Sequence, residues 1–451
     1  MAKRLKRLKY FHRYHQCNFY GIICATKQGG VHTSFKEALQ IIKGVYNLTR
    51  GLKQIVHLVG WQYDGHDSKY PAWFEVNKGL KRPEDETALE SLLWLMKAAR
   101  KYNAVVTLHI NMEMAIPNSP LWDEYVAKDI LYKNPDGSLL KLDIWGGEQT
   151  YGVCKTREWQ AGLAQKRIDR LLKMIPLQKS ATVHLDQFRP VPSPFHGITL
   201  EQEMETAKKI IMYWYAKGIN VTTEFLGYHE LVGYIPLVWH LNLDEASRLK
   251  YPASLICGGG SSWNCRRRTL DTLSGWSGSF CVPEAGCLYE EAWGHAIDQG
   301  FSAQKNNFCK TIEAFAPEFC EKTLIWLFLN RQRPLEHRHT RHSYEVFFSN
   351  NVISRVTVQS RHLAITQRGR MLVDGHDCFV PVVWRKGECI AYSRDGCDRK
   401  WELPEDWCNS RQVRIAALSL QGPTRITDAA TINGCIRLKI TPGQMLVVKK
   451  L

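Results

Sequence analysis

Short apolar runs and longer amphipathic stretches alternate through residues 17–338 of the chain. The short runs predict buried strands at Ile55–Val59, Ala104–His109, Ala181–Leu185 and Ile219–Thr223. The longer stretches, with apolar positions three and four residues apart, predict helices at 34–46, 83–102, 157–175 and 200–217. Strands that alternate with helices of this length are typical of parallel βα units.

Cap signals support two of these helix boundaries. Ser34 and Glu37 form a capping-box pattern, as do Thr199 and Gln202, and Gly218 is placed to end the later helix. Further apolar segments are candidates for the remaining strands: Tyr151–Cys154, Leu237–Leu241, Ala253–Cys257 and Leu324–Phe328. The pattern predicts an α/β fold, first a (β/α)8 TIM barrel and second an open doubly wound sheet. No glycine-rich nucleotide-binding loop supports the second fold.

The pattern changes after about residue 340. Short β-rich segments follow, and turns with Gly, Asp, Asn or Pro separate them: 345–348, 352–359, 362–366, 378–383, 388–392, 413–418, 436–440 and 444–448. This pattern predicts a C-terminal antiparallel β-sandwich domain. We therefore expect a basic N-terminal segment at 1–16, a barrel at 17–338 and a β-sandwich at 339–451.

The charge and hydropathy of the chain indicate which kinds of binding partner are expected. The chain has 451 residues, and its 60 Lys and Arg against 44 Asp and Glu give a formal net charge of +16. Such a surplus favours acidic partners, but the basic residues are mostly dispersed and no nucleic-acid-binding motif accompanies them. We expect a solvated basic surface, no nucleic-acid partner and, without an apolar run of 18 residues, no membrane-spanning helix.

The N-terminus and the cysteines indicate the cellular compartment in which the protein is expected. Residues 1–15 lack the apolar core of a secretory signal, so we expect a cytoplasmic protein. Fourteen scattered cysteines in such a chain are expected to be thiols, and no pair of CxxC motifs predicts a zinc site. The sequence does not determine the oligomeric state.

Two carboxylates follow consecutive predicted strands. Asp186 comes directly after Ala181–Leu185, and Glu224 comes directly after Ile219–Thr223. The intervening residues fit one loop, one helix and one strand, so both acids are expected at the same mouth of a barrel. Retaining glycosidases use two carboxyl groups about 5–5.5 Å apart, which neighbouring strands can supply. Periodicity alone does not distinguish the nucleophile from the proton donor, and solvated loop carboxylates remain the simpler alternative.

Other polar and aromatic residues lie near the same strand ends. His66 and Asp67 are in a polar loop after the 55–59 strand, and His109 and Asn111 alternate with Ile110, so they share one face of their strand. His184 precedes Asp186 by two residues. Six of the fifteen tryptophans fall in predicted loops, where an indole ring can stack on a sugar: Trp61, Trp73, Trp122, Trp145, Trp263 and Trp276. Ordinary packing is the alternative for each of these side chains.

These segments carry a resemblance to a known family. The stretch Gly60–Ser68 (GWQYDGHDS), His109–Asn111, Ser119–Trp122 and Thr182–Asp186 resemble the barrel of the endo-α-N-acetylgalactosaminidases, glycoside hydrolase family 101. The related intracellular α-N-acetylgalactosaminidases of family 129 are also similar. The likeness covers about residues 50–230. It implies a retaining α-glycosidase that acts on O-linked α-N-acetylgalactosamine.

The resemblance also implies roles for individual residues. Asp186 is implied to be the nucleophile and Glu224 the acid/base, while His66, Asp67 and Asn111 are implied to hold the sugar. Family 101 enzymes carry a tryptophan pair on a lid, whereas Met112–Ala115 follows Asn111 here, and Trp145 is the candidate for a similar role. His109 and His184 complete the expected substrate-binding set.

The resulting hypothesis is a double displacement on a carbohydrate or glycopeptide substrate. Asp186 attacks the anomeric carbon while Glu224 protonates the leaving oxygen and later deprotonates water. No cofactor is required, and a structural calcium stays open although no calcium-loop sequence occurs. The alternatives are an α-galactosidase or α-glucosidase and a non-catalytic carbohydrate-binding barrel. Glu284, Glu290 and Glu291 are further carboxylates without an assigned role.

Overall fold

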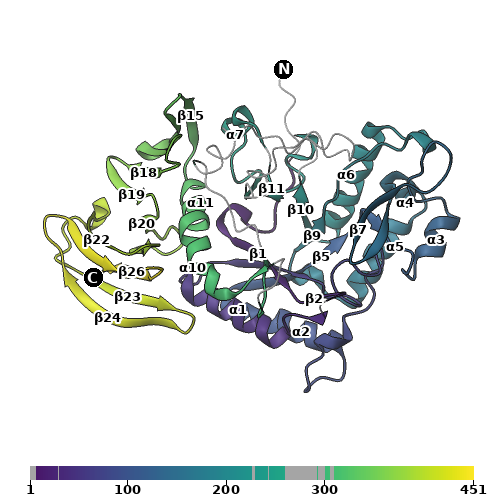
Figure 1. Ribbon diagram of the computed structural model, residues 1–451, viewed down its shortest axis with the longest axis horizontal. Helices are drawn as coiled ribbons and strands as arrows, with labels where there is room; N and C mark the ends of the chain where they lie inside the picture. The colour runs from purple at the N-terminus through teal and green to yellow at the C-terminus, as the bar shows by residue number, and fades with distance from the viewer. Residues whose placement is uncertain are drawn as a thin grey trace.

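A computed structural model describes residues 7–28, 30–225, 229–241, 243–259, 292, 300–304 and 309–451 of the chain. Figure 1 shows a parallel sheet with helices in the purple to teal part of the chain and antiparallel strands in the green to yellow part. The expected Glu284, Glu290, Glu291, Trp263 and Trp276 lie outside the described residues. Within the described ranges, no helix is both long and apolar enough to span a membrane.

The N-terminal part is built on one parallel sheet. Its described strands lie in the order β12-β11-β10-β9-β5-β4-β1-β13-β14, and neighbouring strands pair in parallel. This confirms the predicted α/β class with parallel βα units. The strand bounds are β1 (Asn18–Ile23), β4 (Gln54–Val59), β5 (Ala104–Asn111), β9 (Thr182–Asp186), β10 (Asn220–Phe225), β11 (Leu237–His240), β12 (Cys257–Gly259), β13 (Gly300–Phe301) and β14 (Cys309–Lys310).

Two predicted helices begin where their capping boxes indicate, and two predictions need correction. Helices α1 (Phe35–Leu48) and α6 (Leu200–Ala216) follow Ser34 and Thr199, whose side chains accept the expected backbone N–H. Helix α2 (Ala88–Ala98) begins after Thr87 rather than at Pro83, because Thr87 and Glu90 form a third capping box. The predicted helix 157–175 is two helices, α4 (Lys155–Gln160) and α5 (Leu163–Met174), because Gly162 between them adopts φ 72°.

Three strand predictions also change, and the first of them, 253–257, contains only the first residue of β12. Strand β1 was not predicted, whereas 151–154 falls on β8 (Glu148–Gly152), which pairs antiparallel with β6 (Met114–Ala115) and β7 (Lys141–Trp145) outside the main sheet. The segment 324–328 is helix α11 (Leu324–Leu329), and its continuous apolar run reflects burial of the whole helix. In chain order, β9 and β10 are the fourth and fifth strands of the parallel sheet, after β1, β4 and β5.

The C-terminal part is antiparallel from Pro334 onward. Ten strands form one sheet: β15 (Pro334–His339), β16 (Ser343–Phe348), β17 (Val352–Thr357), β18 (Leu363–Gln367), β19 (Arg370–Asp374), β20 (Asp377–Pro381), β21 (Glu388–Ser393), β26 (Met445–Lys450), β23 (Gln412–Ser419) and β24 (Gly422–Ala430). A separate pair, β22 (Cys397–Glu402) and β25 (Cys435–Ile440), packs Trp401 and Leu438 against Phe379 and Val448. The antiparallel β-domain is confirmed.

The two parts share one hydrophobic core across helix α1. Arg50 pairs with Glu388 at 2.9 Å, Asn47 Nδ2 donates to the Leu420 carbonyl, and Trp384 Nε1 donates to the Thr49 carbonyl. Leu420 also packs so closely on Gly44 that an added Cβ would lie 2.8 Å from its Cδ2. The end of α1 is therefore fixed by both parts.

Shorter elements complete the described chain. They are β2 (Ala25–Thr26), β3 (Gly30–Val31), α3 (Trp122–Ala127), α7 (Glu245–Lys250) and α10 (Phe315–Glu318). Ten of the described cysteines are free thiols, and seven of these are buried.

Candidate active site

Two carboxyl groups meet where neighbouring parallel strands end. Asp186 is the last residue of β9, and Glu224 precedes the last residue of β10, with Leu185 paired to Thr223 between the strands. The Asp186 and Glu224 side chains are hydrogen-bonded to each other. A hydrogen bond between two carboxyl groups forms only when one of them is protonated, because an ionised carboxylate has no donor.

Burial controls the titration of both acids. The pKa of Asp186 is raised to about 6, chiefly by burial and in addition by the neighbouring Glu224. Burial likewise raises the pKa of Glu224, against the opposing effects of the Asp186 hydrogen bond and of the Gln187 backbone N–H. A charged His109 would lower the pKa of Asp186, but burial lowers the pKa of His109 itself to about 3, so this imidazole is neutral near pH 7.

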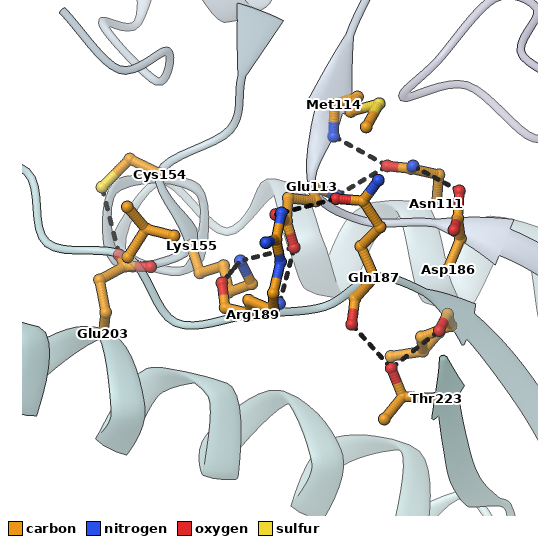
Figure 2. Close-up of polar contacts among 12 residues, drawn as sticks. Asn111, Glu113, Met114, Cys154, Lys155, Asp186, Gln187, Arg189, Glu203 and Thr223 are labelled. Atoms are coloured by element: carbon orange, nitrogen blue, oxygen red, sulfur yellow. Dashed lines mark hydrogen bonds and ion pairs between the residues drawn. The ribbon is translucent and has the colours of Figure 1, made fainter. Parts of the chain in front are cut away.

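Asn111 is oriented toward Asp186 by the backbone beyond β5. The backbone N–H groups of Glu113 and Met114 both donate to Asn111 Oδ1 at 2.8 Å. This leaves Nδ2 to donate to Asp186 Oδ2 at 2.9 Å, as Figure 2 shows. The partners of the Asn111 amide oxygen and nitrogen fit only one orientation of the amide group. The Asn111 N–H group is therefore directed at Asp186.

The loop after β4 brings His66 and Asp67 to the same site. His66 Nε2 lies 3.4 Å from Asp67 Oδ2, and the His66 ring is 5.3 Å from the His109 ring, edge to face. The loop lies against Ala25: His66 N donates to its carbonyl, and a Cβ on Gly60 would be 1.8 Å from that oxygen. Glycine at position 60 therefore allows the close approach that places His66.

A stack of histidines lies beneath the carboxyl pair. His57, His109 and His184 come from adjacent strands β4, β5 and β9, with ring centroids 4.5 Å apart for His57 and His184 and 5.5 Å apart for His109 and His184. Trp239 packs edge-on against His57 and His184. The structure places His184 in this buried layer, with Nδ1 3.0 Å from Thr222 Oγ1.

Three of the tryptophans expected in loops, Trp61, Trp73 and Trp145, separate into two groups. Trp61 and Trp73 are fully buried, and Trp61 Nε1 donates to the His109 carbonyl, so these two belong to the core instead of a sugar-stacking surface. Trp145 is 37% exposed at the end of β7, next to Gly146. A Cβ on Gly146 would lie 2.7 Å from the Asp67 carbonyl, which places this hairpin against the Asp67 loop.

A charged network behind the pair was not predicted. Glu113 accepts from the Arg189 backbone N–H at 2.6 Å and from Arg189 Nη2 at 3.1 Å, and Lys155 Nζ donates to the Arg189 carbonyl at 2.7 Å. Figure 2 shows these residues around the segment that follows Asp186. One signal in the sequence was available: Glu113 is a single charge within the apolar run Met112–Ile116, which indicates a buried charge with a partner.

No cluster suited to a metal ion was found in the described part of the chain. There, no group of three or more His, Cys, Asp or Glu side chains has the geometry to hold one. The structure thus brings together Asp186, Glu224, Asn111, His109, His66 and Asp67, with Trp145 on the adjoining hairpin and His184 one layer below.

Paired carboxyl groups at neighbouring ends of a parallel sheet, with amide and imidazole groups around them, define a site of the glycoside hydrolase type. Residues 27–230 match the model of a glycoside hydrolase family described as endo-alpha-N-acetylgalactosaminidase. This match confirms the resemblance seen in the sequence, and it covers just under half of the chain. The matched part contains Asp186, Glu224, Asn111, His109, His184, His66, Asp67 and Trp145.

Solved structures show the same fold. The ligand-free α-N-acetylgalactosaminidase NagBb from Bifidobacterium bifidum superposes with a TM-score of 0.55 at 12% identity, covering 78% of this chain and 58% of that one. Its GalNAc complex gives a TM-score of 0.56 at 12% identity, with 78% and 57% covered. The chain therefore spans a little over half the length of that protein, and the similarity at this identity concerns the fold.

Proposed function

We propose that this protein is a retaining glycoside hydrolase that cleaves an α-linked sugar, with the α-N-acetylgalactosaminides of O-glycans as its substrate class. The observation that carries this proposal is the hydrogen-bonded contact between Asp186 and Glu224 at adjacent strand ends. The family match over residues 27–230 supports the substrate class. The proposal includes closure of the parallel sheet into a (β/α)8 barrel and a sandwich-like C-terminal domain.

The first chemical step breaks the glycosidic bond. An ionised Asp186 oxygen forms a bond to the anomeric carbon while the bond to the leaving oxygen breaks and Glu224 transfers its proton to that oxygen. The Asn111 amide donates to Asp186 and holds the nucleophile in place. A sugar entering between the two carboxyl groups separates them to the 5–5.5 Å or so that a retaining mechanism uses.

The second step releases the sugar. Glu224, now ionised, takes a proton from water, and the water oxygen displaces Asp186 from the anomeric carbon. His66 and Asp67 are proposed to bind sugar hydroxyl groups at the rim, and Trp145 to stack on the sugar or its aglycone. The mechanism requires no cofactor.

Hydrolysis of 4-nitrophenyl α-glycosides tests this assignment. We expect turnover of the α-N-acetylgalactosaminide above that of the galactoside and glucoside, with the α-anomer as first product by NMR. Asp186→Asn should abolish turnover. Glu224→Ala should keep the first step with this acidic leaving group, which needs no protonation, and azide should restore its second step.

The exposed Glu205, paired with Lys208 on α6, provides a matched control. Glu205→Gln should retain full turnover. A wild-type protein that binds aryl α-glycosides but hydrolyses none would identify a carbohydrate-binding protein instead. Preferred turnover of the galactoside or glucoside would assign the enzyme to that sugar, and a β-anomer as first product would contradict the retaining mechanism.

A further inference from the structure

The segment directly after Asp186 has an unusual backbone. Gln187 and Phe188 adopt φ 54° and 58°, so two consecutive non-glycine residues lie in the left-handed region. Side chains disfavour this conformation, and it persists only where the surrounding structure determines it. The segment therefore depends on contacts from elsewhere in the fold.

Three elements supply those contacts. Glu113, beyond β5, accepts from Arg189 N at 2.6 Å and from Arg189 Nη2 at 3.1 Å. Lys155, which opens α4 and is fully buried, donates to the Arg189 carbonyl at 2.7 Å. Thr223 of β10 lies with its hydroxyl 2.8 Å from the Gln187 carbonyl. Figure 2 shows Arg189 and Gln187 between Glu113 and Thr223.

The segment in turn faces Glu224. The Gln187 backbone N–H is hydrogen-bonded to the Glu224 carboxyl group, and the Arg189 guanidinium acts on it electrostatically. Among the described residues, the other titratable groups that act on Glu224 are Asp186 on β9 and His66 on the loop after β4, while His109 acts on Asp186 and Asp186 acts on Asp67. Displacement of the 187–189 segment would remove an N–H donor and a positive charge from Glu224 together.

Glu113 reaches the other carboxyl group as well. Its backbone N–H donates to Asn111 Oδ1 at 2.8 Å, and Asn111 Nδ2 donates to Asp186. We propose that Glu113 is a positioning residue that holds both carboxyl groups: its backbone orients Asn111 on Asp186, and its side chain holds Gln187 and Arg189 on Glu224. This inference rests on the proposed function of the pair.

Glu113→Gln and Glu113→Asp test this role through the pH profile. Glu113→Gln should lower kcat by roughly ten- to hundred-fold, because the acid/base is misplaced, with little change in KM. The basic limb of the kcat profile should move to higher pH, since Glu224 loses groups that favour its ionised form. A Glu113 that acted only through its negative charge would give the opposite sign, because its removal would favour ionisation of Glu224.

If Glu113→Gln fails to fold, the conservative variant Glu113→Asp still distinguishes a positioning role from an effect of the negative charge alone. Glu113→Asp keeps the charge but shortens the reach to Arg189, so an intermediate loss of kcat with the same upward shift is expected. An unshifted profile in Glu113→Asp would overturn the positioning role. Glu158→Gln is the matched control, because Glu158 is also buried and also pairs with an arginine, Arg167, but contacts neither the carboxyl pair nor the 187–189 segment.

A readout without turnover distinguishes this inference from the proposed function. Carboxyl ¹³C NMR titration of the wild-type protein and of Glu113→Asp reports the Glu224 resonance, assigned by its loss in Glu224→Gln. Suppose that the Glu224 pKa is higher in Glu113→Asp than in the wild-type protein, and that the wild-type protein hydrolyses no α-glycoside. This result would retain the positioning role of Glu113 and reject the proposed hydrolase function. Turnover with identical titration curves would reject the positioning role alone.

Discussion

Two regions of this molecule hold buried carboxyl groups in opposite arrangements. Between helices α4, α5 and α6, Glu158 accepts from Arg167 Nε at 2.7 Å and from Tyr125, and Glu203 accepts from Tyr132, Cys154 and a backbone N–H. At the ends of β9 and β10, Asp186 and Glu224 face each other. In the helix region, each carboxylate has its own hydrogen-bond donors. At the strand ends, two carboxyl groups face each other.

The difference separates a structural role from a chemical one. A buried carboxylate that faces a cation is stable when charged, and removal of its charge leaves the cation without a partner. Two buried carboxyl groups in contact cannot both ionise at low cost, so their proton stays available near neutral pH. The same residue types therefore stabilise the fold in one region and prepare proton transfer in the other, at the expense of stability.

The largest effect should come from Asp186→Asn. We expect kcat to fall by about 10,000-fold or more, because the nucleophile is lost. The free energy of unfolding in urea should stay equal or rise, since an amide removes the cost of burying a charge. Aryl α-glycoside hydrolysis and equilibrium denaturation measure the two quantities. A variant that loses both activity and stability would place Asp186 with the structural carboxylates.

Glu158→Gln should give the reverse result. The substitution leaves Arg167, which is only 2% exposed at its side chain, without its ionic partner. Breaking a buried pair in this way costs about 3–5 kcal/mol, so the free energy of unfolding should fall by that amount while kcat of the folded fraction stays within a few fold. Arg167 also donates to the Pro71 carbonyl, and an unchanged stability would show that this contact and water satisfy it.

The pH dependence of stability sharpens the contrast at the pair. The pKa of Asp186 is raised from 3.8 to about 6 by burial, so the native state binds its proton more tightly than the unfolded state does. Stability from this group is therefore present at low pH and lost as pH rises from about 4 to 6, by up to about 3 kcal/mol.

The Asn variant isolates that contribution. The stability of Asp186→Asn relative to wild type should increase between about pH 4 and 6 and then stay constant, as measured by urea denaturation across that range. Glu224→Gln, measured in parallel, shows how much of the change depends on the second acid. A difference that is independent of pH would mean that Asp186 titrates normally in the native state.

Local sequence patterns predicted much of the scaffold. The capping boxes at Ser34 and Thr199 were found because each is a contact between residues three positions apart, and the strands before Asp186 and Glu224 because each is a short apolar run. Helix α11 was assigned as a strand because a fully apolar run carries no periodicity to distinguish the two. Gly162 divided a helix whose pattern of apolar residues continues across it.

The site residues that lie at strand ends could be predicted from the sequence. Asp186, Glu224 and Asn111 follow from their place at the ends of neighbouring strands. The burial of Trp61 and His184 and the contact of Glu113 with Arg189 depend on tertiary packing between segments distant in sequence, which no local pattern records. The resemblance to a family supplied roles, but the partners that orient those residues required coordinates.

The smallest effect is expected when one threonine hydroxyl is removed in each region, at the strand ends and between the helices. Thr223 Oγ1 lies 2.9 Å from the Leu185 carbonyl and 2.8 Å from that of Gln187, beside the carboxyl pair, while Thr206 Oγ1 lies 3.0 Å from Thr156 Oγ1 beside Glu203. Each change to valine removes one buried hydroxyl and should cost about 1 kcal/mol of stability. Only Thr223→Val should also lower kcat, by a few fold, because it loosens the segment that places the Gln187 N–H on Glu224. Equal kcat values for the two variants would show that this segment is held by Glu113 and Lys155 without help from Thr223.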